Sequence, residues 1–139
     1  MKRLSTTIFL AVGLVIVADQ CGWATDYRRF GETNEGVFFY DIEGIAQHSK
    51  ETVSVWIKEK FSPQGVRSLS RAQGNNYMNL DYALSQEELN CRDRTFRQLS
   101  LALYNKDETV LSSSINRIKE FEPVLPGSVE EKLLNAVCK

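Results

Sequence analysis

The amino-acid sequence predicts an α+β fold: a single antiparallel sheet of five to six strands, with a short middle helix and a C-terminal helix packed on it. Apolar and polar side chains alternate between residues 51 and 61 with the period of two that is typical of a half-buried strand. The alternation returns in later segments, which short polar turns separate. From Ser128, which forms a capping box with Glu131, apolar residues instead recur every three or four positions, as in an amphipathic helix.

The other expected elements follow in order along the chain. The four residues that begin at Thr33 have the turn chemistry of a hairpin. Ser62 followed by Pro63 starts the middle helix, and Gly74 ends it. The expected strands cover residues 27–32, 37–41, 51–61, 80–91, 94–104 and 110–118.

The first residues have the pattern of a secretory signal peptide. Lys2 and Arg3 precede an apolar run at residues 8–18, and small residues surround a cleavage point after Ala24. The run is shorter than the roughly twenty residues that a membrane-spanning helix needs, and the polar residues before Cys21 argue against a lipoprotein. We therefore expect a signal peptide at residues 1–24 and a single exported domain at residues 25–139. That domain would have no transmembrane segment and would lie in the periplasm, at the cell surface or outside the cell.

Removal of the signal peptide leaves two cysteines, Cys91 and Cys138. An exported protein lies in an oxidising compartment, where two cysteines are expected to form a disulfide. A zinc site would need about four ligands, and His48 is the remaining soft donor. Cys138 follows Leu134 by four residues and so lies on the apolar side of the last helix. A bond within one chain would pin this helix to the sheet, whereas a bond between two chains would lie at a dimer interface.

The strand pattern also predicts which side chains share a face of the sheet. We expect the main core on the aliphatic face, built by Val53, Val55, Ile57, Leu99, Leu101 and Leu103. Trp56, Phe96 and Tyr104 are expected on the opposite face. A helix of the same chain is the simpler cover for this second face, and a protein partner or a second copy is the alternative. Arg92, Arg94 and Arg97 are candidates for the same partner or dimer surface, with solubility as the simpler role.

The residues that catalysis would need are missing from the pattern, so we expect no enzyme and no cofactor. His48 lies in a polar turn without a nucleophile or an orienting group beside it in the sequence. Phosphate-binding glycine motifs are missing, and a net charge of −1 does not favour nucleic acid. The adjacent pairs Glu87-Glu88 and Glu130-Glu131 point apart and are expected to be solvated rather than to form an acid–base dyad.

Five segments of the mature chain carry a further signal through their order and spacing. They are VFFYDIEGI, VSVWIKEKF, LNCRDRTFR, ALYNKDETVLSSS and the closing PVLPGSVEEKLLNAVCK. In these segments, and in the positions of Cys91 and Cys138, the chain resembles the surface-adhesin protein E family. It departs from the family at Gly44, Glu108 and Phe121, where serine, glycine and tryptophan are usual, and it lacks the lipid-attachment cysteine of the best-known adhesin.

The resemblance implies an exported antiparallel sheet with helices against it and without catalytic residues. It also implies a protein partner, because the characterised adhesin of this family binds extracellular-matrix proteins of its host. The first functional hypothesis is therefore an exported non-catalytic domain that recognises a protein partner. The alternative is a periplasmic structural or envelope-accessory domain with no external ligand, which would use its aromatic face to form a homodimer.

Overall fold

A computed structural model describes residues 25–116 and 119–139. The predicted signal peptide, residues 1–24, lies outside the described residues, and so do residues 117 and 118, at the end of the last predicted strand. The elements are β1 (Tyr27–Glu32), β2 (Gly36–Asp41), β3 (Ala46–Gln47), β4 (Thr52–Phe61), α1 (Pro63–Gln73), the 3₁₀ helix η1 (Asn75–Tyr77), β5 (Leu80–Asn90), β6 (Thr95–Asn105), β7 (Val110–Ile115), β8 (Glu122–Pro123) and α2 (Val129–Val137).

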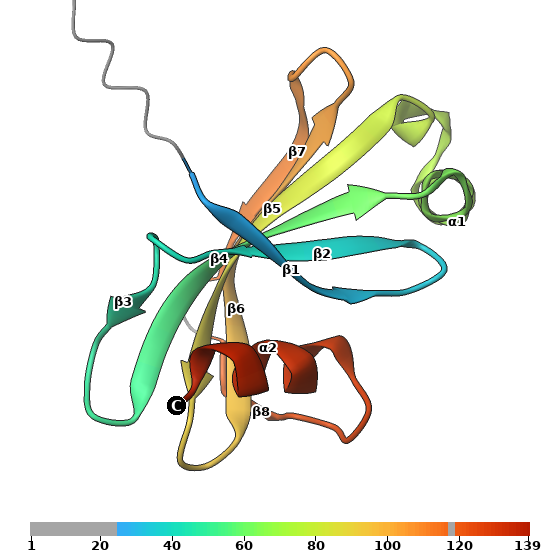
Figure 1. Cartoon of the computed structure of the whole chain (residues 1–139). Coiled ribbons are helices and arrows are strands. Elements are labelled where there is room, and N and C mark those ends of the chain that lie inside the picture. Colours follow the sequence, from blue (N-terminus) through green and yellow to red (C-terminus); the bar gives the residue numbers. More distant parts are fainter. Residues whose placement is uncertain (1–24, 117–118) are drawn as a thin grey trace, which may run out of the picture.

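All strand pairs are antiparallel, and the six longer strands follow the order β1-β2-β4-β5-β6-β7 (Figure 1). The short strand β3 pairs with β4, and β8 pairs with β6. The predicted α+β class and its single antiparallel sheet are thereby confirmed. The sheet has eight strands rather than five to six, because β3 and β8 are two residues long and too short to show an alternating pattern.

Both helices begin where the sequence predicts. The Ser62 hydroxyl accepts a hydrogen bond of 3.1 Å from the amide of Gly65, and Ser128 accepts one of 3.2 Å from the amide of Glu131. These bonds satisfy amides that the first turn of a helix leaves without a partner. Gly74 ends α1 with a φ of 112°, a conformation that glycine adopts without strain. Within the described residues, no helix is long and apolar enough to span a membrane.

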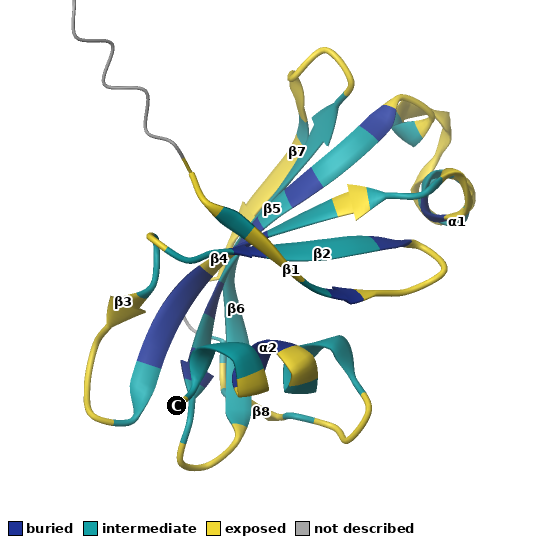
Figure 2. Ribbon diagram, viewed as in Figure 1, coloured by how far each residue is buried: buried dark blue, intermediate teal, exposed yellow. Residues whose placement is uncertain are grey.

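The core lies between α2 and the face of the sheet that α2 covers, which we call the inner face (Figures 1 and 2). Leu133 of α2 is 1% exposed, and Val55 and Leu89 of the neighbouring strands β4 and β5 are fully buried. These side chains form one cluster with Tyr40, Val53 and Ile57. The predicted aliphatic row of β4 is therefore core.

The prediction for β6 is wrong at Phe96, and a bulge explains the error. Phe96 pairs with Leu89 on the inner face and packs against the core cluster, instead of lying beside Trp56. The register between β5 and β6 shifts at Leu99, because Glu87 pairs with Gln98 while Gln86 pairs with Ser100. One extra residue changes the phase of the alternation. Side chains before and after Leu99 therefore reach the inner face from positions of opposite parity.

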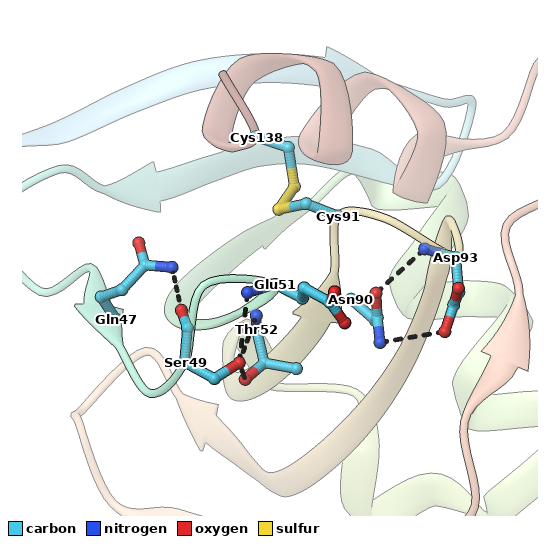
Figure 3. The surroundings of a disulfide bond; sticks show 8 residues. All are labelled: Gln47, Ser49, Glu51, Thr52, Asn90, Cys91, Asp93 and Cys138. Atoms are coloured by element: carbon cyan, nitrogen blue, oxygen red, sulfur yellow. Dashed lines mark hydrogen bonds between the residues drawn. A yellow bond between two sulfur atoms is a disulfide. The ribbon is translucent and has the colours of Figure 1, made fainter.

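The structure joins Cys91 to Cys138 within the chain, with their Cα atoms 5.5 Å apart (Figure 3). Cys138 follows α2 directly, and Cys91 follows β5, so the bond ties the end of the helix to the β5–β6 turn. The amide of Cys91 also donates to the Glu51 carbonyl at 2.8 Å. This placement agrees with the predicted intrachain bond.

Two side chains order the turns on either side of the disulfide (Figure 3). Asn90 accepts a hydrogen bond of 2.9 Å from the amide of Asp93. In the neighbouring loop, Ser49 Oγ accepts from the amides of Glu51 at 3.2 Å and Thr52 at 3.1 Å. Short polar side chains that bond nearby amides stabilise tight turns. Hydrogen bonds therefore stabilise the backbone of the turns next to the disulfide.

Candidate functional site

The face of the sheet opposite α2, which we call the outer face, is the candidate functional site. Three rows of directly paired side chains form it. They are Trp56, Gln86, Ser100 and Ile115; Phe39, Lys58, Leu84, Ala102 and Ser113; and Lys60, Tyr82, Tyr104 and Val110. Paired residues of adjacent strands point to the same side of a sheet, so each row lies on one face.

The first row presents apolar side chains to solvent. Trp56 is 38% exposed and Ile115 is 70% exposed, and the strand pairing places both on the face that α2 does not cover. Val110, in the third row, is 55% exposed. Large apolar residues that remain exposed together on one face are typical of an interaction surface. The simpler expectation, that a helix of the same chain covers Trp56, is not met in the described residues.

The third row contains a stacked aromatic pair beside a lysine. The rings of Tyr82 and Tyr104 lie 4.7 Å apart between centroids and are nearly parallel, at 9°. The Lys58 ammonium lies 4.5 Å from the Tyr82 ring centroid and 5.6 Å from that of Tyr27. A cation within about 6 Å of an aromatic face is attracted by it. The arrangement therefore holds both tyrosines and one positive charge on the outer face.

The phenols of this group stay neutral at physiological pH. Burial is the main cause that raises the pKa of Tyr27 and of Tyr82 above the usual 10.0, and nearby Asp41 and Glu108 add to it respectively. A neutral phenol can donate a hydrogen bond as well as accept one. Both tyrosines therefore offer a partner an apolar ring with a polar tip.

The structure separates the candidate arginines from one another and pairs each with a carboxylate. Arg92 and Arg94 lie in the β5–β6 turn and contact Glu51 at 2.6 Å and Glu131 at 3.4 Å. Arg97 lies on the outer face, where it contacts the Glu88 carboxylate at 2.9 Å. The Arg97 guanidinium also lies 4.5 Å from the Phe121 ring centroid. Since each charge is balanced by its partner, the three residues do not form a free basic patch.

Of the six candidate surface residues, the structure brings Trp56, Tyr104 and Arg97 to the outer face and places Phe96 in the core. The sequence-based interpretation missed Lys58 and Tyr82. The alternation in β4 and β5 places both on the side of Trp56, so the signal was present in the sequence.

The inner face contains the carboxyl groups of Glu59 and Glu87, of which Glu59 was expected in the inner row of β4 and Glu87 was not. The prediction that the side chain of Glu87 is solvated is wrong, because it is 8% exposed and faces the core side of β5. Glu88 points outward, as expected for its neighbour. Burial raises the pKa of Glu87 to about 7, with a contribution from Glu130, and burial likewise raises the pKa of Glu59 to about 7, with a contribution from Glu35.

These shifts predict how stability depends on pH. A carboxyl whose pKa is higher in the folded state favours folding while it is protonated. The contribution is therefore complete below pH 4.5, the unperturbed value, and is lost as the pH rises towards about 7. We expect Glu87→Gln to reduce this loss, so that the variant exceeds the parent protein in free energy of unfolding at pH 8 but not at pH 4.5. Urea denaturation at both pH values measures the free energy of unfolding of the variant and of the parent protein.

Glu43→Gln is the matched control, since Glu43 is exposed. It should leave the dependence of unfolding free energy on pH unchanged. A Glu87→Gln variant with the same pH dependence as the parent would show that the Glu87 carboxyl is not the group that burial perturbs.

Comparison with known proteins gives a family and a fold. The model of the family "Surface-adhesin protein E" matches residues 27–139. The chain is also similar to the crystal form II structure of Haemophilus influenzae protein E, with a TM-score of 0.51 and 13% sequence identity over 81% of this chain and 86% of that chain. A search of curated protein sequences finds no match. Because the family model covers most of the chain and every strand and helix of the structure, the chain belongs to the surface-adhesin protein E family.

Proposed function

We propose that this protein is an exported, non-catalytic binding domain that holds a protein partner on the outer face of its sheet. The observation that carries the proposal is the exposure of Trp56 and Ile115 on the face opposite α2, which also carries the stacked Tyr82 and Tyr104. Tryptophan and tyrosine are enriched among the residues that supply most of the energy of protein interfaces.

The charges of this face favour a partner with an apolar contact and a single acidic group. Arg97 is paired with Glu88, and Lys60 is paired with Asp81. Lys58, between the rings of Tyr27 and Tyr82, has aromatic neighbours in place of a carboxylate. A carboxylate of the partner would bond Lys58 without displacing an existing ion pair. Charges placed in this way contribute to the choice of partner more than to affinity.

Membership of a surface-adhesin family and the Cys91–Cys138 disulfide support export. We propose cleavage after Ala24, which would leave residues 25–139 as the exported domain. The alternative function is a periplasmic structural domain that uses the same exposed apolar face to form a homodimer. Protease treatment of intact cells separates the two, because an adhesin is cleaved while a periplasmic domain is protected.

Trp56→Ala tests the binding face. Loss of a central tryptophan costs about 2 kcal/mol or more at an interface, which corresponds to roughly thirtyfold weaker binding. We expect this loss when the purified domain binds immobilised extracellular-matrix proteins in a surface plasmon resonance measurement. The fold should be retained, since Trp56 is 38% exposed.

Leu125→Ala is the matched control, because Leu125 is 65% exposed but lies outside the sheet. It should bind like the parent protein. Equal losses in the two variants would mean that the outer face is not the binding face.

A further inference from the structure

A cavity lies between the inner face of the sheet and the first turn of α2, on the opposite side of the sheet from the proposed partner surface. Its volume is about 180 Å³. Strands β1, β2, β4, β5 and β6 and helix α2 all contribute to its lining, which includes Phe30, Phe38, Glu59, Glu87, Leu101 and Leu133. Phe30, Phe38 and Glu59 are half-buried.

Glu87 is the first sign that the cavity binds a ligand. Its side chain lines the cavity, and the residue is 8% exposed. Among the described residues, Glu87 Oε2 is buried without a hydrogen-bond partner. Burying a carboxyl oxygen in this way is costly, and native proteins normally provide each buried polar atom with a partner. A ligand that donates a hydrogen bond to Oε2 would remove this cost.

Glu59 is the second polar group, and it lies at the other end of the cavity. Glu87 pairs with Val55 and Glu59 pairs with Ala83, so the two carboxyl residues are four positions apart along adjacent strands. At about 3.4 Å per residue and about 4.8 Å between strands, their Cα atoms are roughly 14 Å apart. Ile57 and Ser85 lie between them and form the floor. The cavity therefore has a carboxyl at each end and a largely apolar middle.

The charges around the cavity favour a cation. Its lining contains Glu59, Glu87 and Glu130 but no lysine or arginine. Glu35 raises the pKa of Glu59, and Glu130 raises the pKa of Glu87, because a nearby negative charge disfavours a second one. Lys119 lowers the pKa of Glu87. Within the described residues, no three His, Cys, Asp or Glu side chains gather as metal ligands. An organic cation that spans the cavity fits this arrangement better than a metal ion.

We propose that the cavity binds a short aliphatic diamine in its doubly charged form, with one ammonium at Glu87 and the other at Glu59. Each ammonium would donate to a carboxylate, and the methylene chain would lie on Ile57 beneath Phe30 and Phe38. A cavity needs roughly 10–15 Å³ to hold one water molecule, so a cavity of about 180 Å³ has room for a small organic molecule such as a four-carbon diamine. The proposal is independent of the outer face and of any protein partner.

Isothermal titration calorimetry of the oxidised protein with 1,4-diaminobutane tests the proposal. We expect saturable binding of one molecule per chain at pH 8, where the two carboxyl groups are ionised. At pH 5 both amines remain charged but the carboxyl groups are protonated, so binding should weaken at least tenfold. Both 1-butylamine, with a single ammonium, and 1,4-butanediol, without charge, should bind at least tenfold more weakly than the diamine at pH 8.

Glu87→Gln and Glu59→Gln each remove one carboxylate while keeping the shape of the side chain, and each should weaken diamine binding at least tenfold. Glu59 is half-buried, so its variant keeps the test valid should Glu87→Gln disturb packing. Glu43→Gln, on an exposed residue, and Trp56→Ala, on the outer face, should bind like the parent. No binding at millimolar diamine, or equal binding by the parent and both glutamine variants, would overturn the proposal.

Discussion

Cys138→Ser is expected to lower the free energy of unfolding by about 2–5 kcal/mol. The bond that it removes joins residues 47 positions apart and closes a loop that contains β6, β7, β8 and α2. The chain-entropy relation gives about 4 kcal/mol for a loop of this length. Urea denaturation of the oxidised protein and of the variant measures the difference.

The partner cysteine supplies the matched control for this prediction. Cys91→Ser removes the same bond and should cost the same amount, and the double variant should cost no more than either single variant. The denatured, unreduced mature protein should contain no thiol that alkylates. A covalent dimer on a non-reducing gel that collapses on reduction would show that the cysteines bond between chains.

Leu133→Ala is the second change with a large expected effect, also about 2–5 kcal/mol. Leu133 is 1% exposed and belongs to the cluster that joins α2 to Val55 and Leu89 on the sheet. Truncation to alanine removes these contacts and leaves a cavity, and both terms destabilise the fold. Thermal or urea unfolding at constant pH measures the loss.

Leu125→Ala removes the same atoms from a side chain that is 65% exposed. Its effect should stay within about 0.5 kcal/mol, the range for surface substitutions. If Leu133→Ala had an effect as small as this control, α2 would not be packed on the inner face in solution.

Much of the fold could be predicted because the signals are local. The capping serines Ser62 and Ser128 lie next to the helices that they start, and the alternation of apolar residues in β4 involves neighbouring residues of one strand. The phase of β6 could not be predicted, because the shift at Leu99 depends on how β6 pairs with β5. The face of the sheet on which Phe96 lies could therefore not be predicted either.

Part of the candidate site could also be predicted, because some of its signals are local. Trp56 and Tyr104 follow the alternation of their own strands, so both could be assigned to the outer face. The ion pair between Arg92 and Glu51 joins residues 41 positions apart, and no local pattern predicts it. Without that partner, the arginines could be interpreted as a free basic cluster.

The burial of Glu87 is a third feature that was not predicted from the sequence. A charged residue next to another one normally indicates a solvated segment, but the Glu88 side chain is 14% exposed and lies against Arg97 on the outer face. Glu87 departs from this rule because β5 alternates strictly and turns this position towards α2. Residues that break a local rule are often functional. The diamine site proposed above rests on this departure.

The most direct test of the proposed binding face is a photocrosslinker at position 56 of the exported protein, in intact cells exposed to extracellular-matrix proteins. If the outer face holds a protein partner as proposed, the crosslinker at the exposed position 56 gives an adduct with one of the added proteins, and the same crosslinker at the exposed position 125 should give none. An adduct of twice the mass of this chain would instead identify a homodimer face. That result, or equal adducts from both positions, would contradict the assignment of the outer face to a protein partner.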